Sequence, residues 1–246
     1  MYAPTQNGIE KSVRSVRYAE AAPPYELREL VYCFWELKTD AALPEDFQYH
    51  VLPDACVDII FDATDPRLAT IMTPHTTSEV LVLGRSFHYV GVRLLPGVWR
   101  GGLENVVGSS VDVLQIGGLS VASLCAELKE RDFSAQQATL SNVVRRLAKN
   151  DLAVTDSLVV RILENTDTIR TVADMARLVA MSPRQLQRRL KQAVGFSPHD
   201  FLKVLHLQQS FGQHYLASYT DQSHFIHSFR RITGYTPAKY AKKFDV

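Results

Sequence analysis

The sequence repeats itself once near its carboxyl end, and this repeat constrains the fold more than any other feature. The stretch SPRQLQRRLKQAVGFSPHDF begins at Ser182, and DQSHFIHSFRRITGYTPAKY begins 39 residues later at Asp221. Each copy has a helix-capping residue, an apolar pair, a glycine, an aromatic residue and then Ser-Pro or Thr-Pro. This order is typical of a helix that ends at the glycine and is followed at once by a helix that begins at the proline. Two similar helical units are therefore predicted.

The residues that carry the repeat have the same structural purpose in both copies. Apolar side chains at positions i and i+4 lie on one face of a helix and anchor it to a core. A glycine after the last turn adopts the left-handed backbone that commonly ends a helix. In chain order, these residues are Leu186, Leu190 and Gly195 in the first copy and Phe225, Phe229 and Gly234 in the second.

A second amphipathic stretch, TIRTVADMARLVAMS, precedes the first copy. Its spacing predicts a helix over residues 171–180 that stops at Met181 and Ser182, before Pro183 begins the next helix. Two helices joined by a tight turn, the second with a basic outer face, form the helix-turn-helix arrangement. The apolar stripe of the first helix consists of Ile169, Val172, Met175, Ala176 and Val179.

Four long polar side chains follow one face of the second helix. They fall at i, i+3, i+4 and i+7, opposite the apolar pair, and are Arg184, Gln187, Arg188 and Lys191. Arginine suits guanine and glutamine suits adenine in the major groove, and basic side chains suit phosphates. A solvated helix face has the same composition, so that interpretation stays open; the repeat and the turn favour DNA contact.

Residues from about Leu158 to Tyr240 resemble the DNA-binding domain of the AraC/XylS family of bacterial transcription regulators. The resemblance lies in TVADMARLVAMSPRQLQRRLKQAVGFSP and, more specifically, in the D-Q-S-H-F, F-R-R and G-Y-T-P elements of YTDQSHFIHSFRRITGYTPAKY. It implies two helix-turn-helix units, joined by a long helix, that enter successive major grooves. By position, it implies base-facing roles for Arg184, Gln187 and Arg188 in the first unit and for Gln222, Ser223, His224 and His227 in the second.

The second unit departs from the family pattern. Between the expected linker helix, about 198–211, and Asp221 there are only the residues GQHYLASYT. This segment is too short for a turn, a full scaffold helix and a second turn. We therefore expect the scaffold helix to be largely deleted, with Leu216 and Ala217 as a remnant. An alternative function follows: a regulator-derived protein that binds a ligand or a protein and has lost independent DNA reading.

The rest of the chain predicts an α+β fold. Three runs rich in Val, Ile, Phe and Tyr predict strands, and the last is expected to form a hairpin near Gly84, Arg85 and Ser86. From Val121 the apolar spacing becomes helical. The expected domains are a β-rich regulatory domain, cupin-like or a related sheet, then a helical bridge and an all-helical helix-turn-helix domain. Their respective bounds are 1–119, 120–150 and 151–246.

Charge is divided unevenly between the two ends of the chain. Residues 1–150 carry 14 basic and 18 acidic side chains, whereas residues 151–246 carry 13 basic and 8 acidic ones. The whole-chain charge of +1 therefore averages an acidic part, −4, and a basic part, +5. This division indicates that only the carboxyl-terminal part meets a polyanion such as DNA.

The amino-terminal part also resembles an uncharacterised β-rich domain that often precedes such modules. The resemblance lies in VLPDACVDIIF and VGVRLLPG, and it implies no particular ligand. Trp35, Arg93 and Trp99 are the candidate ligand-binding residues, because pockets combine aromatic side chains with a few polar groups. A core position is the competing interpretation for Trp35. Arg93 lies in an apolar strand and must reach solvent, a carboxylate or a ligand.

No motif of catalysis or metal binding is recognisable in the sequence. It lacks H-x-H, G-x-S-x-G, a P-loop and a glycine-rich nucleotide fingerprint, so no catalytic residue, metal or cofactor is expected. The three cysteines are far apart and are expected to be buried free thiols in a reducing cytoplasm. No apolar run approaches a membrane span, and the amino terminus lacks the apolar core of a secretory signal.

Together these features predict a cytoplasmic, sequence-specific DNA-binding transcription regulator that is controlled through its amino-terminal domain. Double-stranded DNA is its expected partner, and no membrane contact is expected. A small-molecule effector and a second copy of the chain, forming a homodimer, are further candidate partners.

Overall fold

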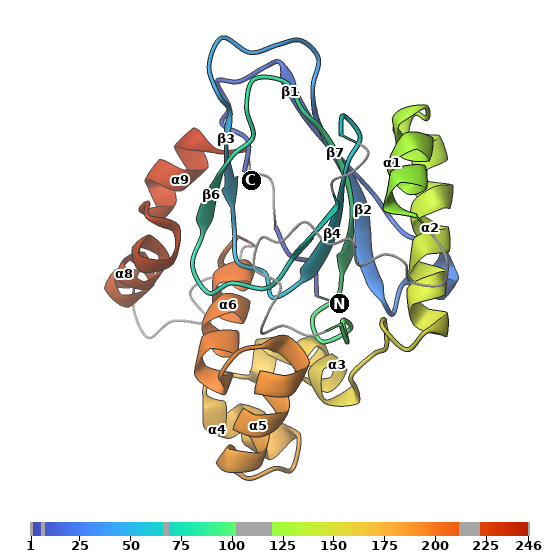
Figure 1. Ribbon diagram of the computed structural model, residues 1–246. Helices are drawn as coiled ribbons and strands as arrows, with labels where there is room; N and C mark the ends of the chain where they lie inside the picture. Colours follow the sequence, from blue (N-terminus) through green and yellow to red (C-terminus); the bar gives the residue numbers. More distant parts are fainter. Residues whose placement is uncertain (1, 6–7, 66–68, 102–119, 212–221, 246) are drawn as a thin grey trace.

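A computed structural model describes residues 2–5, 8–65, 69–101, 120–211 and 222–245 (Figure 1). The amino-terminal part contains an antiparallel five-stranded sheet and a separate two-stranded sheet. The larger sheet has the order β1 (Val16–Ala21), β2 (Val31–Thr39), β7 (His88–Leu94), β4 (Val57–Asp62) and β5 (Ala69–Met72). The smaller sheet pairs β3 (Gln48–Val51) with β6 (Glu79–Val82).

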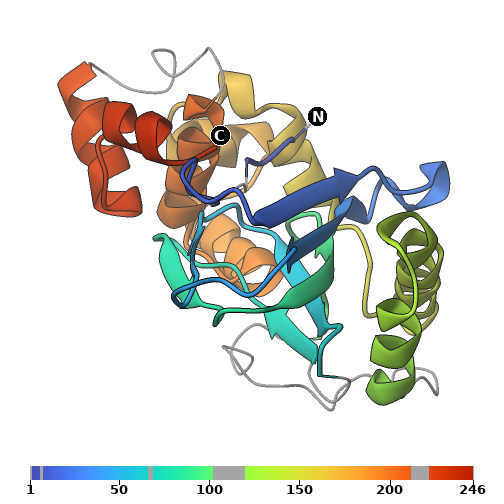
Figure 2. The ribbon, with the colours of Figure 1, turned by 90° about the horizontal axis from the view of Figure 1, so that it is seen from above.

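The two faces of the larger sheet have different neighbours. One face packs against two amphipathic helices, α1 (Val121–Lys129) and α2 (Phe133–Lys149), which lie side by side in both views (Figures 1 and 2). The other face and the two-stranded sheet share a second apolar cluster. Alternating side chains of one strand therefore contribute to two separate cores, as strand geometry requires.

The expected hairpin over residues 79–95 is wrong. Strand β6 pairs with β3, whereas β7 lies between β2 and β4 in the other sheet. The chain does turn near Gly84, whose φ of 78° is left-handed, but this turn carries it from one sheet to the other. Alternation of apolar residues predicts strands without specifying their partners. Strands β1 and β5 and the 3-10 helix at Tyr25–Leu27 lie outside the three predicted runs, because each is short and has no long apolar stretch.

The carboxyl-terminal part is helical, as predicted, and its caps account for the helix bounds. Ser182 and Gln185 form a capping box at the start of α5, and Gly195 ends this helix with a φ of 76°. Ser197 and Thr236 cap two further helices that begin at proline. The helices are α3 (Ser157–Glu164), a 3-10 turn (Thr166–Thr168), α4 (Val172–Leu178), α5 (Pro183–Val194), α6 (Pro198–Ser210), α8 (Gln222–Thr233) and α9 (Pro237–Lys243).

Two further predictions concern the described residues. All three cysteines are buried and free, as expected. No helix in the described part of the chain has the length and apolarity needed to cross a bilayer. The proposed scaffold remnant, Leu216 and Ala217, lies outside the described residues.

Candidate nucleic-acid interface and ligand cavity

The predicted stripe on α5 is exposed and forms one continuous surface. Arg184, Gln187, Arg188 and Lys191, together with Ser197, line a shallow groove. The opposite face of the helix holds Leu186 and Leu190, which are fully buried against α3, α4 and α6. Burial of that apolar face fixes the rotation of the helix and turns the polar stripe outward.

The positive charge of this stripe is not neutralised within the described structure. Arg184, Arg188 and Lys191 make no ion pair with any residue in the described ranges, although the Lys191 ammonium donates to the Gly195 carbonyl at 2.9 Å. Other arginines nearby are paired: the Arg189 guanidinium lies 3.5 Å from the Asp156 carboxylate. A stripe of three unpaired cations and one amide is suited to a polyanion with readable base edges.

In the second unit, two of the four predicted base-facing side chains are described by the structure. Ser223 and His227 on α8 are exposed, whereas Phe225 and Phe229 are buried, as the repeat predicts. The side chains of Gln222 and His224 lie outside the described part of the structure. The helix itself is therefore present, in an orientation set by the two phenylalanines.

Helices α8 and α9 pack directly against the amino-terminal domain (Figure 1). Leu52, which follows β3, belongs to the apolar cluster of Phe225, Phe229 and Tyr240. The Ser78 amide and hydroxyl both donate to the Ile232 carbonyl, at 2.9 and 2.8 Å. This contact joins two parts of the chain that are distant in sequence.

A segment near the amino terminus also meets the carboxyl end of the described chain at this contact. The Lys11 amide donates to the Lys243 carbonyl at 2.9 Å, and the Asp245 amide donates to the Ile9 carbonyl at 3.1 Å. The Lys243 ammonium lies 3.0 Å from the Glu10 carboxylate. Short antiparallel pairing therefore connects residues 9–11 with residues 243–245.

His50 on β3 is the polar centre of the contact with α9. Its Nε2 lies 3.2 Å from the Thr233 carbonyl and its Nδ1 lies 3.1 Å from the Tyr240 hydroxyl. Because a carbonyl only accepts, Nε2 carries the proton and Nδ1 accepts from tyrosine. Burial lowers the pKa of His50 below its ordinary value, so the neutral ring is the form suited to this interface.

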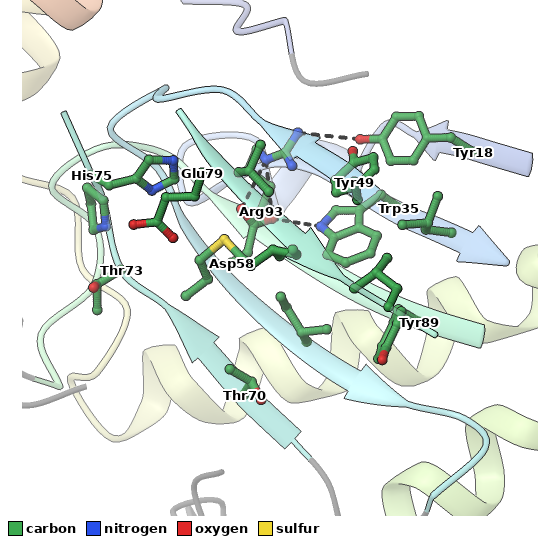
Figure 3. Close-up of a pocket in the computed structure, with 17 residues that line it drawn as sticks. Tyr18, Trp35, Tyr49, Asp58, Thr70, Thr73, His75, Glu79, Tyr89 and Arg93 are labelled. Carbon is green, nitrogen blue, oxygen red and sulfur yellow. Dashed lines mark hydrogen bonds and ion pairs between the residues drawn. The ribbon is translucent and has the colours of Figure 1, made fainter. Parts of the chain in front are cut away.

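A cavity of about 330 Å³ lies between the two sheets of the amino-terminal domain (Figure 3). Such a volume is at the lower end of the roughly 300–1,000 Å³ typical of small-molecule sites. Its wall is mainly apolar, with four aromatic side chains from four different strands. These are Tyr18, Trp35, Tyr49 and Tyr89.

One end of the cavity is charged and buried. The Arg93 Nε lies 3.2 Å from Asp58 and 3.4 Å from Asp54, and its Nη1 lies 3.6 Å from Glu20. The Trp35 indole donates to Asp58 at 2.7 Å (Figure 3). Arg93 therefore meets the requirement for a carboxylate partner, and burial raises the pKa of Asp58 despite the neighbouring guanidinium.

Comparison with known protein families adds to this geometry. Residues 162–203, from α3 into α6, match the model of bacterial regulatory helix-turn-helix proteins of the AraC family. The chain contains an AraC-family helix-turn-helix. The match includes α4, α5 and the groove residues of α5, so the resemblance is confirmed for the first unit. Residues 19–112 match a domain family of unknown function, DUF6597, which confirms the resemblance of the amino-terminal part to an uncharacterised domain.

The comparisons with curated proteins and with solved structures are less informative. No curated protein matches the chain. Among solved structures, an apo variant of ToxT from Vibrio cholerae has a TM-score of 0.42 at 11% identity, covering 92% of this chain and 95% of that one. Wild-type ToxT bound to an unsaturated fatty acid has a TM-score of 0.39 at 9% identity, covering 92% and 93%. Similarity at this level supports no statement about ligand or function.

Three residues of the amino-terminal domain were predicted to bind a ligand. The structure brings two of them together in the cavity. Trp35 and Arg93 line the cavity, and Trp35 is also buried as a core residue would be. Trp99 is buried in the cluster beneath α1 and α2 and forms a bridge with Ala153, so it does not line the cavity. Among the described residues, no three His, Cys, Asp or Glu side chains are placed to hold a metal ion.

Sequence reasoning missed Asp58 and three tyrosines of the cavity. Asp58 is the second residue of β4 and lies directly opposite Arg93 in the pairing of β4 with β7. The signal available was an acidic and a basic residue, each within an apolar strand. Such residues commonly pair when both are buried.

Proposed function

We propose that this protein is a sequence-specific DNA-binding transcription regulator that is controlled through its amino-terminal domain. The observation that supports DNA reading is the exposed, unpaired stripe of α5 on an AraC-family helix-turn-helix. The apolar face of helix α5 packs against buried residues of α3, α4 and α6, so the helix can enter a major groove as a rigid element. The protein is proposed to act in the cytoplasm by binding, without catalysing a reaction.

Control through the amino-terminal domain is supported by strand β3, which touches the cavity and the second unit at once. Tyr49 and Val51 line the cavity, whereas His50 bonds to α9 and to the residue that ends α8. Successive side chains of a strand point to opposite faces. A molecule that displaces Tyr49 or Val51 therefore shifts the strand that holds α8 and α9, and this shift would change how the second unit is presented to DNA.

A binding assay tests DNA reading directly. A duplex is first selected from a random-sequence library on the wild-type protein, and its affinity is then measured by mobility shift. Arg188→Ala is expected to lower that affinity about tenfold or more, since a bidentate base contact contributes roughly 1–3 kcal/mol. Lys129→Ala on α1 is the control and is expected to bind as the wild type does. Failure to select any specific duplex at low salt would favour the alternative protein that no longer reads DNA.

A further inference from the structure

The charged end of the cavity has more negative than positive groups. Arg93 is the one arginine or lysine among the described lining residues, and it already contacts Asp54 and Asp58. Glu20 approaches the same guanidinium, and Glu79 lies on the cavity wall. An anionic ligand would meet a neutralised arginine and additional carboxylates, which is unfavourable in a desolvated site.

Asp58 retains capacity for another donor. A carboxylate can accept about four hydrogen bonds, and among the described residues Asp58 accepts from two groups, the Trp35 indole and the Arg93 guanidinium. It is nearly fully buried and lies on the cavity wall. Burial raises the pKa of this carboxyl, which indicates that the negative charge is incompletely stabilised by the protein alone.

Aromatic side chains line the cavity wall next to the Asp58 carboxylate. The rings of Tyr18 and Trp35 lie 6.4 Å apart with an interplanar angle of 34°, and Tyr49 and Tyr89 also line the cavity. Aromatic faces attract ammonium groups, with tryptophan the strongest, and contribute about 2 kcal/mol when the cation is desolvated. Most of the remaining wall is aliphatic, formed by Leu37, Val51, Ile60, Met72, Leu81 and Leu83, and Thr70, Thr73, Pro74 and His75 complete it.

We propose that the cavity binds an organic cation, a molecule with one amine or quaternary ammonium group on an apolar body. The ammonium group lies beside Asp58 and the rings of Tyr18 and Trp35, and the apolar body fills the aliphatic part of the cavity. This proposal rests on the proposed control through the amino-terminal domain, because it names the class of molecule that would exert that control.

Three probes of nearly equal size test the proposal on the full-length protein. Benzyltrimethylammonium is the cation, neopentylbenzene is its neutral isostere, and 4-phenylbutyrate is the anion. Binding is measured by calorimetry and by the change in tryptophan fluorescence. The cation is expected to bind about tenfold more tightly than the neutral isostere, which corresponds to about 1.4 kcal/mol, and the anion is expected to bind most weakly. Equal or tighter binding of the anion, or binding of none of the three, would overturn the proposal.

Variants then locate the site. Asp58→Asn is expected to lower the affinity for the cation about tenfold while leaving the affinity for the neutral isostere unchanged. Glu127→Gln on α1, an exposed carboxylate far from the cavity, is the matched control and is expected to change neither affinity. If Asp58→Asn does not fold, the order of the affinities of the three probes for the wild-type protein still tests the proposal. Unchanged cation affinity in a folded Asp58→Asn protein contradicts the assignment.

The same samples separate this proposal from the proposed function. Mobility shift of the selected duplex without any probe reports DNA reading, and calorimetry without DNA reports the ligand class. DNA binding without preference for the cation refutes the ligand class alone. Preference for the cation without DNA binding refutes the proposed function and leaves the cation site standing.

Discussion

Gly91 on β7 lies directly opposite Trp35 on β2, and a Cβ atom at position 91 would overlap the indole ring. The indole can therefore lie flat against the sheet, with its N–H directed to Asp58. A glycine in a central strand weakens the strand intrinsically. At this position it makes room for the side chain that forms the cavity wall.

Gly91→Ala is expected to destabilise the protein by about 1–3 kcal/mol, because the new methyl group forces the indole out of position. The free energy of unfolding in urea measures this loss. In a Trp35→Phe background the same substitution is expected to cost clearly less, because the smaller ring leaves space. Equal costs in the two backgrounds would show that the clash lies elsewhere.

Lys191→Ala is expected to weaken binding to all DNA sequences by a similar factor, because an ammonium group at the end of the stripe suits a phosphate. The slope of log affinity against log salt concentration should decrease by about one. Gln187→Ala should instead alter the base preference at one position of the selected duplex and leave this slope unchanged. Lys129→Ala again provides the control for both measurements.

The contact between His50 and α9 is expected to weaken in acid. Burial lowers the pKa of His50 from 6.5, so below about pH 6.5 the unfolded chain binds more protons than the folded one. Stability is therefore full above this pH and declines as the pH falls toward the folded pKa. The difference in unfolding free energy between pH 7.5 and pH 5.5 should be smaller in His50→Gln than in the wild type. His206 has a lowered pKa of the same origin and contributes equally to both proteins.

Ala180→Gly is expected to stabilise the protein by about 0.5–1 kcal/mol. Ala180 lies in the turn just beyond α4 and has a left-handed φ of 53°, a conformation that costs an alanine roughly 1–2 kcal/mol and glycine little. The midpoint of thermal unfolding measures the effect. Ala176→Gly within α4 is the matched control, and it should destabilise because glycine is unfavourable in a helix interior. A decrease in stability for Ala180→Gly would contradict this account of the turn.

Local features of the carboxyl-terminal part could be predicted well. The caps at Ser182 and Ser197, the left-handed Gly195 and the burial of Leu186 follow from rules that operate within a few residues. The exposed stripe of α5 follows from the same periodicity. The structure confirms these elements, and each was predicted from residues that are close together in the chain.

Long-range relationships in the amino-terminal part could not be predicted in this way. The pairing of β6 with β3, and the placement of β7 between β2 and β4, depend on strands separated by many residues. Arg93 was expected to need a carboxylate, yet spacing alone does not single out Asp58, 35 residues away. The cavity exists because these distant pairings bring side chains of seven strands around one space, so its lining could not be read from any one segment.

The antiparallel pairing of residues 9–11 with residues 243–245 has a practical consequence for handling the protein. A purification tag or fluorescent protein fused at the carboxyl end would be attached within a few residues of the contact between the second unit and the amino-terminal domain, whereas Tyr2 and Thr5 bond elsewhere, to Asp54 and Gln208. Such a fusion would crowd the packing of α9 against the amino-terminal domain. A fluorescent label is therefore better attached in the exposed turn between α1 and α2, at Arg131, which leaves the carboxyl end free of any addition.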